Sequence, residues 1–275
     1  LGRAYRYITP GEMYSDYYGG NSIRMLTVLV EFLFSVPYLG VQLRASGDLF
    51  SVLTDGLVNP TTGMIALSTV VMIYVSSGWL RSVAFVDCAQ AVLLALGIAI
   101  LGGIVIYYAG GWGGFTASFA EVVRNDLALD NNLTSDGFSS KVALPGSIQF
   151  VSSGAQSIGG GWTGIMCMTY MFALMGIQSS PAFSMWAYSN KTSRAFRWQQ
   201  VVASSLVIGV ILFSFTIIQG IGGHVLIEKG VIENATDKNL IPQLINLLSD
   251  SAPWLVGLLA VCALAAMQST GAAYM

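Results

Sequence analysis

The sequence has few charged residues and few residues of the kinds that bind metals or form disulfides. Charged residues make up only 9% of its 275 residues, and it contains one histidine and three cysteines. A soluble domain has about 25% charged residues. The net charge of −2 provides no basic surface for nucleic acid, and His224 alone cannot form a metal cluster. The cysteines lie in or beside apolar stretches without CxxC spacing, which predicts buried thiols.

Apolar residues are abundant instead, at 54% of the chain. A helix needs about 20 apolar residues to cross the hydrocarbon core of a membrane. Six stretches approach or exceed this length, at about residues 25–50, 63–80, 83–108, 161–188, 201–223 and 252–275. The sequence therefore predicts an all-α, multi-pass membrane protein. The chain begins with Leu and ends within an apolar stretch, so we expect an internal fragment of a longer protein.

Lysine and arginine predict the orientation, because positive charge is retained on the cytoplasmic side of short loops. One side would hold Arg3, Arg6, Arg24, Arg81, Lys191, Arg194 and Arg197, and the other Arg124, Lys141, Lys229 and Lys238. The side with more positive charge is expected to be cytoplasmic. Residues 109–160 and 224–251, which are rich in Gly, Asn, Asp and Ser, would then be outer loops.

The first apolar stretch carries a polar stripe. Glu31, Ser35, Tyr38 and Gln42 follow helical spacing, so they share one face, which we expect to meet protein or water. Inserting a carboxylate at this depth costs roughly 3 kcal/mol, which makes a functional role for Glu31 the working hypothesis. The alternative is a structural glutamate that is hydrogen-bonded to a neighbouring helix.

The fourth stretch contains Gly176-Ile177-Gln178-Ser179-Ser180-Pro181. Glycine, serines and proline in this order favour local unwinding, and transporters place substrates and ions at broken helices. The alternative is a kink whose freed backbone groups bond to the serines.

The last stretch contains Ala265-Ala266-Met267-Gln268-Ser269-Thr270. A hard cation needs oxygen ligands, and inside a bilayer hydroxyls and freed carbonyls can supply them. Ser269 and Thr270 are therefore candidate sodium ligands. Ordinary hydrogen bonds between helices are the alternative.

Four motifs together resemble the sodium:solute symporter (solute carrier 5-like) family, and the resemblance covers nearly the whole chain. They are residues 9–18, beginning Thr9-Pro10-Gly11-Glu12; residues 36–43, beginning Val36-Pro37-Tyr38; Gly78-Trp79-Leu80-Arg81-Ser82-Val83-Ala84-Phe85-Val86-Asp87-Cys88-Ala89-Gln90; and residues 253–259, beginning Pro253-Trp254, followed by Ala265-Ala266-Met267-Gln268-Ser269-Thr270. The third motif is the most specific, although Trp79 and Val86 replace a Gly and a Thr of the family pattern.

The resemblance implies a LeuT-like fold of two inverted five-helix repeats. Residues 1–275 would form one incomplete transporter domain with core helices three to eight. The resemblance also implies a sodium site formed by the Ala266 carbonyl and the hydroxyls of Ser269 and Thr270, with further ligands from a first core helix outside this sequence. Asp87 matches a family residue on the sodium exit route. A lone Asp near the start of a helix can equally cap it.

The expected function is sodium-coupled import of a small organic solute by alternating access across the plasma membrane. Sodium would be the coupling ion and the lipid bilayer the surroundings, with no organic cofactor and no nucleic acid. Candidate solute-binding residues are Glu31, Tyr38, Gln42, Gln178 and Ser179, with Ser180 beside them. No nucleophile with a nearby base is evident, so an enzyme is not expected. Two alternatives stay open: a sensor module fused to a signalling domain, and a proton-coupled transporter that uses Glu31.

Overall fold

The computed structural model describes residues 2–130, 133–134, 137–143, 162–177, 179–190, 192, 194–233 and 239–274. Over this part of the chain the regular structure is helical, apart from one isolated antiparallel bridge between Leu133 and Ser139. The helices are α1 (Gly2–Tyr5), α2 (Pro10–Tyr18), α3 (Asn21–Leu53), α4 (Pro60–Ser77), α5 (Trp79–Tyr108), α6 (Gly111–Ala128), α7 (Gly164–Ile177), α8 (Pro181–Ser189), α9 (Arg194–Trp198), the π-helical η1 (Gln199–Leu212), α10 (Phe213–Glu228), α11 (Leu240–Asn246) and α12 (Pro253–Tyr274).

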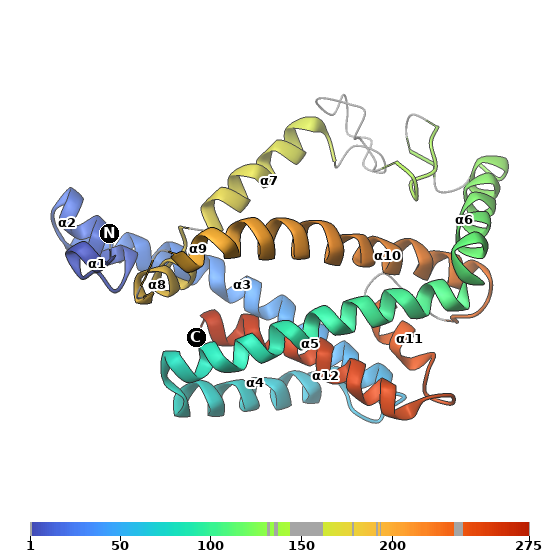
Figure 1. Ribbon diagram of the computed structural model, residues 1–275, viewed down its shortest axis with the longest axis horizontal. Helices are drawn as coiled ribbons and strands as arrows, with labels where there is room; N and C mark the ends of the chain where they lie inside the picture. The colour runs from blue at the N-terminus through green and yellow to red at the C-terminus, as the bar shows by residue number, and fades with distance from the viewer. Residues whose placement is uncertain are drawn as a thin grey trace.

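Within the described residues, five helical segments are long and apolar enough to cross a membrane. They are α3, α4, most of α5, the continuous segment from Phe196 to Glu228, and most of α12. In Figure 1, α5 lies between α10 and α12, and α6 stands across one end of these long helices. α7 slopes away from them. The chain thus has the all-helical architecture that its apolar stretches predict.

The core forms where α3, α5, α10, α11 and α12 meet. Its fully buried side chains include Leu49, Val105, Leu226, Leu244 and Leu259. Glycines let the helices approach closely. A Cβ on Gly97 of α5 would lie 2.6 Å from the Cβ of Cys262 on α12, and one on Gly102 would lie 2.6 Å from Cδ1 of Phe215 on α10. Small residues at such contacts are typical of membrane helices, where packing drives association.

The fourth apolar stretch, 161–188, is not one continuous helix. It divides into α7 and α8, and Ser179 and Ser180 form a tight turn between them. Pro181 is the first residue of α8, and Ser180 before it is extended, with φ −64° and ψ 150°. A residue that precedes proline is driven out of the helical region by the proline ring. The break therefore lies where the Gly-x-Gln-Ser-Ser-Pro pattern predicts unwinding, although Gln178 lies outside the described residues.

The two expected outer loops each contain a helix. α6 lies within 109–160, and the end of α10 with α11 lies within 224–251. Gly110 and Gly111, with φ of 95° and 77°, turn the chain from α5 into α6. α6 is held by one buried face that includes Phe115 and Val122, and α11 buries Leu244 and Ile245 in the core. The composition of these segments did not predict the two helices, because glycine and polar residues surround their apolar positions.

The segment before α3 folds through local polar contacts. Thr9 Oγ1 accepts a hydrogen bond from the Glu12 backbone at 3.3 Å, and Glu12 Oε2 accepts from the Ile8 and Thr9 backbones at 2.8 and 3.3 Å. This is a capping box at the start of α2. The bonds from Ile8 and then Thr9 hold the pKa of Glu12 below its ordinary value, because they stabilise the carboxylate form.

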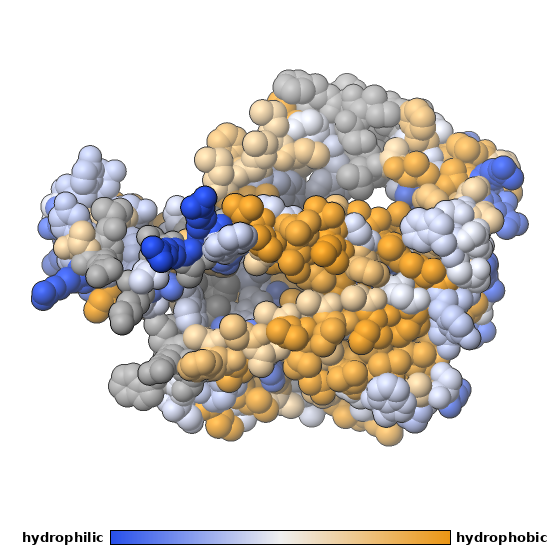
Figure 2. Space-filling view, viewed as in Figure 1, coloured by the Kyte–Doolittle hydropathy of each residue, from blue (hydrophilic) through white to orange (hydrophobic). Residues whose placement is uncertain are grey.

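The surface of the long helices is strongly apolar. Figure 2 shows hydrophobic side chains gathered over α10 and α5, with hydrophilic ones towards both ends. Leu206, Ile208 and Phe213 are each more than half exposed. Soluble proteins rarely expose such large apolar patches, so lipid is the natural neighbour of this surface. Cys262 is buried as expected, but the prediction was wrong for Cys88 and Cys167, which are exposed on helix faces.

The contact between α5 and α12 provides a test of the fold. Gly97→Ala should lower the thermal unfolding midpoint of the detergent-solubilised protein, because the added methyl group would overlap Cys262. Overpacking of this kind costs about 1–3 kcal/mol. Gly103→Ala, on the same helix with no atom within 4 Å of the added Cβ, is the matched control and should not lower the midpoint. Equal midpoints for the two variants would contradict the packing.

Candidate functional site

The three predicted sodium ligands lie within one turn of α12. Ser269 Oγ and Thr270 Oγ1 both donate to the carbonyl oxygen of Ala266, at 3.1 and 3.3 Å. Thr216 makes the same bond to Leu212 at an exposed position. Because helical serines and threonines commonly bond in this way, the bonds alone do not identify a sodium site. The polar contacts around the two hydroxyls are therefore also needed to judge the site.

Beside these hydroxyls, α4 and α5 contact α12 through polar groups. Gln90 Nε2 on α5 donates to Gln268 Oε1 on α12 at 3.2 Å, and the Tyr74 hydroxyl on α4 donates to the Gln268 backbone carbonyl at 3.1 Å. Asp87 lies one turn before Gln90, within electrostatic range of Tyr74. The motif that contains Asp87 thus meets the motif that contains Ser269 and Thr270.

Two oxygens of this cluster lack hydrogen-bond donors. Asp87 Oδ1 and Gln90 Oε1 are both buried without a partner, and Gln90 as a whole is only 7% exposed. Buried polar atoms are normally paired, so orphaned acceptors call for an explanation. Carboxylate and amide oxygens are ligands for hard cations such as sodium. The cluster therefore offers two unpartnered oxygens of the kind that a hard cation binds.

Sequence reasoning selected Asp87 but assigned no role to Gln90 or Gln268. Asp87 and Gln90 are three residues apart, which places them on one helical face. That spacing was a usable signal for Gln90. Gln268 carried no comparable signal, because only the packing of α5 against α12 shows that the two glutamines meet.

The predicted solute-binding residues divide into two groups. A pocket of about 610 Å³ lies between α2, α3 and the break that separates α7 from α8, and Glu31, Ser179 and Ser180 line it. Tyr38 and Gln42 do not line this pocket; Tyr38 stacks on Phe34 with ring centroids 5.7 Å apart. The break meets α3 at the level of Glu31, and Tyr38 lies seven residues, about 10 Å, further along the helix axis.

Some oxygens at this pocket have one hydrogen-bond partner, and one has none. The Ser35 hydroxyl donates to Glu31 Oε1 at 3.2 Å. Ser180 Oγ is buried without a hydrogen-bond partner. Because the two serines lie in the non-helical turn, their side chains and backbone are open to a ligand in a way that a continuous helix would prevent.

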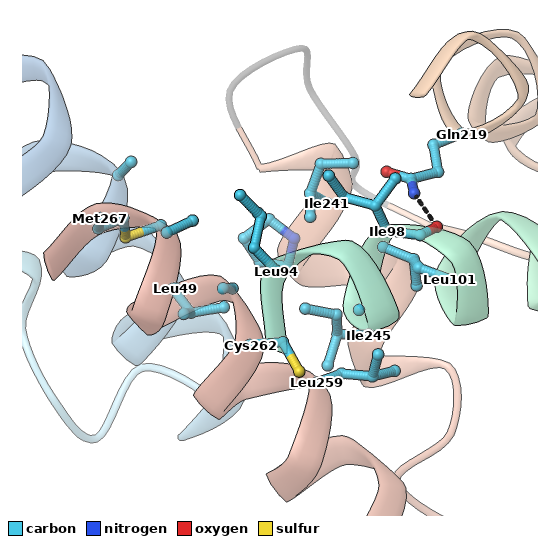
Figure 3. Close-up of a pocket in the computed structure, with 15 residues that line it drawn as sticks. Leu49, Leu94, Ile98, Leu101, Gln219, Ile241, Ile245, Leu259, Cys262 and Met267 are labelled. Carbon is cyan, nitrogen blue, oxygen red and sulfur yellow. Dashed lines mark hydrogen bonds between the residues drawn. The ribbon is translucent and has the colours of Figure 1, made fainter. Parts of the chain in front are cut away.

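A second, apolar pocket of about 310 Å³ lies at the centre of the bundle (Figure 3). Leu94, Ile98 and Leu101 approach it from α5, Leu259 and Cys262 from α12, and Ile241 and Ile245 from α11. The buried Gln219 of α10 donates through Nε2 to the Ile98 carbonyl at 2.7 Å, which joins α10 to α5. Ala266 also borders this pocket. Its walls suit hydrocarbon rather than a cation.

Across the described residues, the structure shows no group of three or more His, Cys, Asp or Glu side chains arranged to hold a metal ion. The candidate site residues that the structure describes carry hydroxyls, amides and single carboxylates instead. Such ligands suit sodium and small polar solutes.

Comparison with known proteins identifies the family. A family model described as the sodium:solute symporter family matches residues 3–275. No curated protein and no solved structure matches the chain. The family match covers nearly the whole sequence, and the long apolar helices fit a multi-pass membrane transporter. These findings confirm the resemblance seen in the motifs, and the chain belongs to the sodium:solute symporter family.

Proposed function

We propose that this chain belongs to a symporter that uses the sodium gradient to import a small organic solute by alternating access. The observation that carries the proposal is the contact between the Asp87–Gln90 motif of α5 and Gln268 of α12. This contact brings a motif with two unpartnered buried oxygens, Asp87 Oδ1 and Gln90 Oε1, against the helix that carries Ser269 and Thr270. A site for sodium and a route away from it thus share one interface.

In this mechanism, sodium binds to the Ala266 carbonyl and to the hydroxyls of Ser269 and Thr270. Binding exchanges the two hydroxyl bonds to Ala266 for bonds to the cation. Each sodium ion that falls through the membrane potential contributes about 2.3 kcal/mol per 100 mV, before any concentration term. On release, the carboxylate of Asp87 attracts the departing ion and Gln90 Oε1 supplies a second oxygen.

The solute binds in the pocket beside Glu31, where the chain leaves helical form at Ser179 and Ser180. A broken helix at the solute site supports the LeuT-like five-plus-five fold, in which α3 and the α7–α8 segment would be the third and sixth core helices. The plasma membrane is the proposed location, because the inward sodium gradient acts there.

Glu31 also supports a second candidate, a proton-coupled transporter of the same fold. It is a carboxylate in the walls of the solute pocket, so protonation could accompany solute binding. Uptake measured at fixed sodium while pH is varied separates the two. Sodium coupling predicts that uptake still requires sodium at every pH.

Removing one sodium ligand should weaken sodium binding. In proteoliposomes containing the full-length transporter, Ser269→Ala and Thr270→Ala should each raise the sodium concentration for half-maximal uptake about tenfold, which corresponds to about 1.4 kcal/mol. Thr216→Ala is the matched control, because Thr216 makes the same backbone bond on an exposed face of α10. Unchanged sodium dependence in both site variants would refute the assignment.

Neutralising Asp87 should slow sodium release. Asp87→Asn keeps the shape of the side chain but removes its charge, so sodium-coupled efflux from preloaded vesicles should fall about tenfold, or about 1.4 kcal/mol in barrier height. Asp55→Asn changes an exposed aspartate in the turn between α3 and α4 and should leave efflux unchanged. Wild-type efflux in Asp87→Asn would refute a role for Asp87 in sodium release.

A further inference from the structure

We propose that the solute is a small organic cation, specifically an N-methylated ammonium compound. The proposal rests on the proposed function, because it takes the pocket between α3 and the α7–α8 break as the solute site. It goes further by assigning the charge and the chemical class of the solute. Three properties of the pocket support it: its charge, its aromatic walls and its few polar groups.

The charge of the pocket is negative. Among the described residues that line it, Glu31 is the charged one, and the rest are apolar or carry hydroxyls. The described arginine nearest in sequence, Arg24, lies about two turns earlier on α3 and faces Glu12, with Nη2 3.9 Å from Oε1. None of the ion pairs between described residues involves Glu31. A carboxylate in this position attracts a cation and repels an anion.

One hydroxyl does not saturate this carboxylate. Ser35 donates to Oε1 at 3.2 Å, whereas an ionised carboxylate offers about four lone-pair sites. A charged group at this depth of a membrane helix is costly when it has no opposite charge beside it. A cationic solute would supply that opposite charge each time it binds. The free energy of pairing then becomes part of the affinity for the solute.

The walls of the pocket favour a methylated nitrogen. Tyr14 and Tyr18 of α2 and Phe34 of α3 line it, and an ammonium group is attracted to the faces of such rings. A primary ammonium carries three N–H donors that all need acceptors. An N-methylated ammonium carries its charge without that demand and buries its methyl groups against aromatic and aliphatic side chains. Aromatic walls around one carboxylate therefore match it better.

The serines of the break give such a solute a second attachment point. Ser180 Oγ is buried without a partner, and Ser179 lies beside it in the same pocket. A hydroxyl group on the solute would pair with Ser180 while its ammonium group faces Glu31. Choline has this combination, a trimethylammonium group and one hydroxyl, and it is a suitable probe of the chemistry.

The experiment compares three probes of nearly the same shape by calorimetric titration of the purified full-length transporter in sodium. They are choline, its uncharged isostere dimethylbutanol, in which carbon replaces nitrogen, and the anionic dimethylbutyrate. Choline should bind at least about tenfold more tightly than either of the others. Equal or tighter binding of dimethylbutanol or dimethylbutyrate would overturn the proposal. So would the absence of choline binding at millimolar concentration.

Variants of Glu31 then test whether this carboxylate causes the preference for choline. Glu31→Gln should weaken choline binding at least about tenfold while changing dimethylbutanol binding by less than about twofold. Glu31→Asp retains the charge and should keep the preference for choline, which guards against a folding defect in the first variant. Glu121→Gln, an exposed glutamate on α6, is the matched control and should bind all probes as the wild type does. Unchanged choline affinity in Glu31→Gln would refute the role of Glu31.

Failure of this inference differs from failure of the proposed function. If sodium drives uptake of neutral or anionic solutes while choline is excluded, symport stands and the cationic class is wrong. If choline binds with the predicted preference but sodium drives no uptake, the pocket assignment stands and sodium coupling is wrong. Uptake of choline with sodium should also carry more charge per solute than uptake of an uncharged solute, which a current measurement detects.

Discussion

The close packing of α5 against α12 is the contact on which the rest of the structure depends. Helices in lipid gain little from hydrophobic burial, so they associate through tight contacts and polar bonds. Gly97 lets α5 approach Cys262, and the same approach brings Gln90 within hydrogen-bond distance of Gln268. A wider separation would break that bond and part the α5 motif from the α12 motif. The central apolar pocket, with walls from both helices, depends on the same spacing.

The two proposed sites differ in their backbone. The hydroxyls of Ser269 and Thr270, the proposed sodium ligands, project from a regular helix. The pocket beside Glu31 instead borders a turn at Ser179 and Ser180, where backbone and side chains are both available. A small, hard cation gains from a rigid set of oxygens. A larger organic solute needs the space that a broken helix provides.

Much of the helical architecture was predictable because its causes are local. Apolar runs indicate membrane helices through their length, and Pro181 disrupts the helix through its own ring. The helix α6 was not predicted, because Gly111, Gly113 and Gly114 obscure the pattern of its buried face. Ser269 and Thr270 were selected as candidates because adjacent hydroxyls are unusual in an apolar run, and their role stays a prediction. The roles of Gln219 and Gln268 could not be predicted, because each bonds to a residue far away in the sequence.

The sequence by itself determined the membrane class, the positions of the long helices, the break before Pro181 and the family. Each of these follows from composition, local sterics or a motif within a short stretch. The tertiary structure decided which polar residues meet. It joined Gln90, one turn after Asp87, to Gln268 of α12, and it placed Glu31 with Ser179 while leaving Tyr38 and Gln42 outside that pocket. The physical reason is that helical periodicity defines the face of a side chain, but only packing defines which helix lies opposite that face.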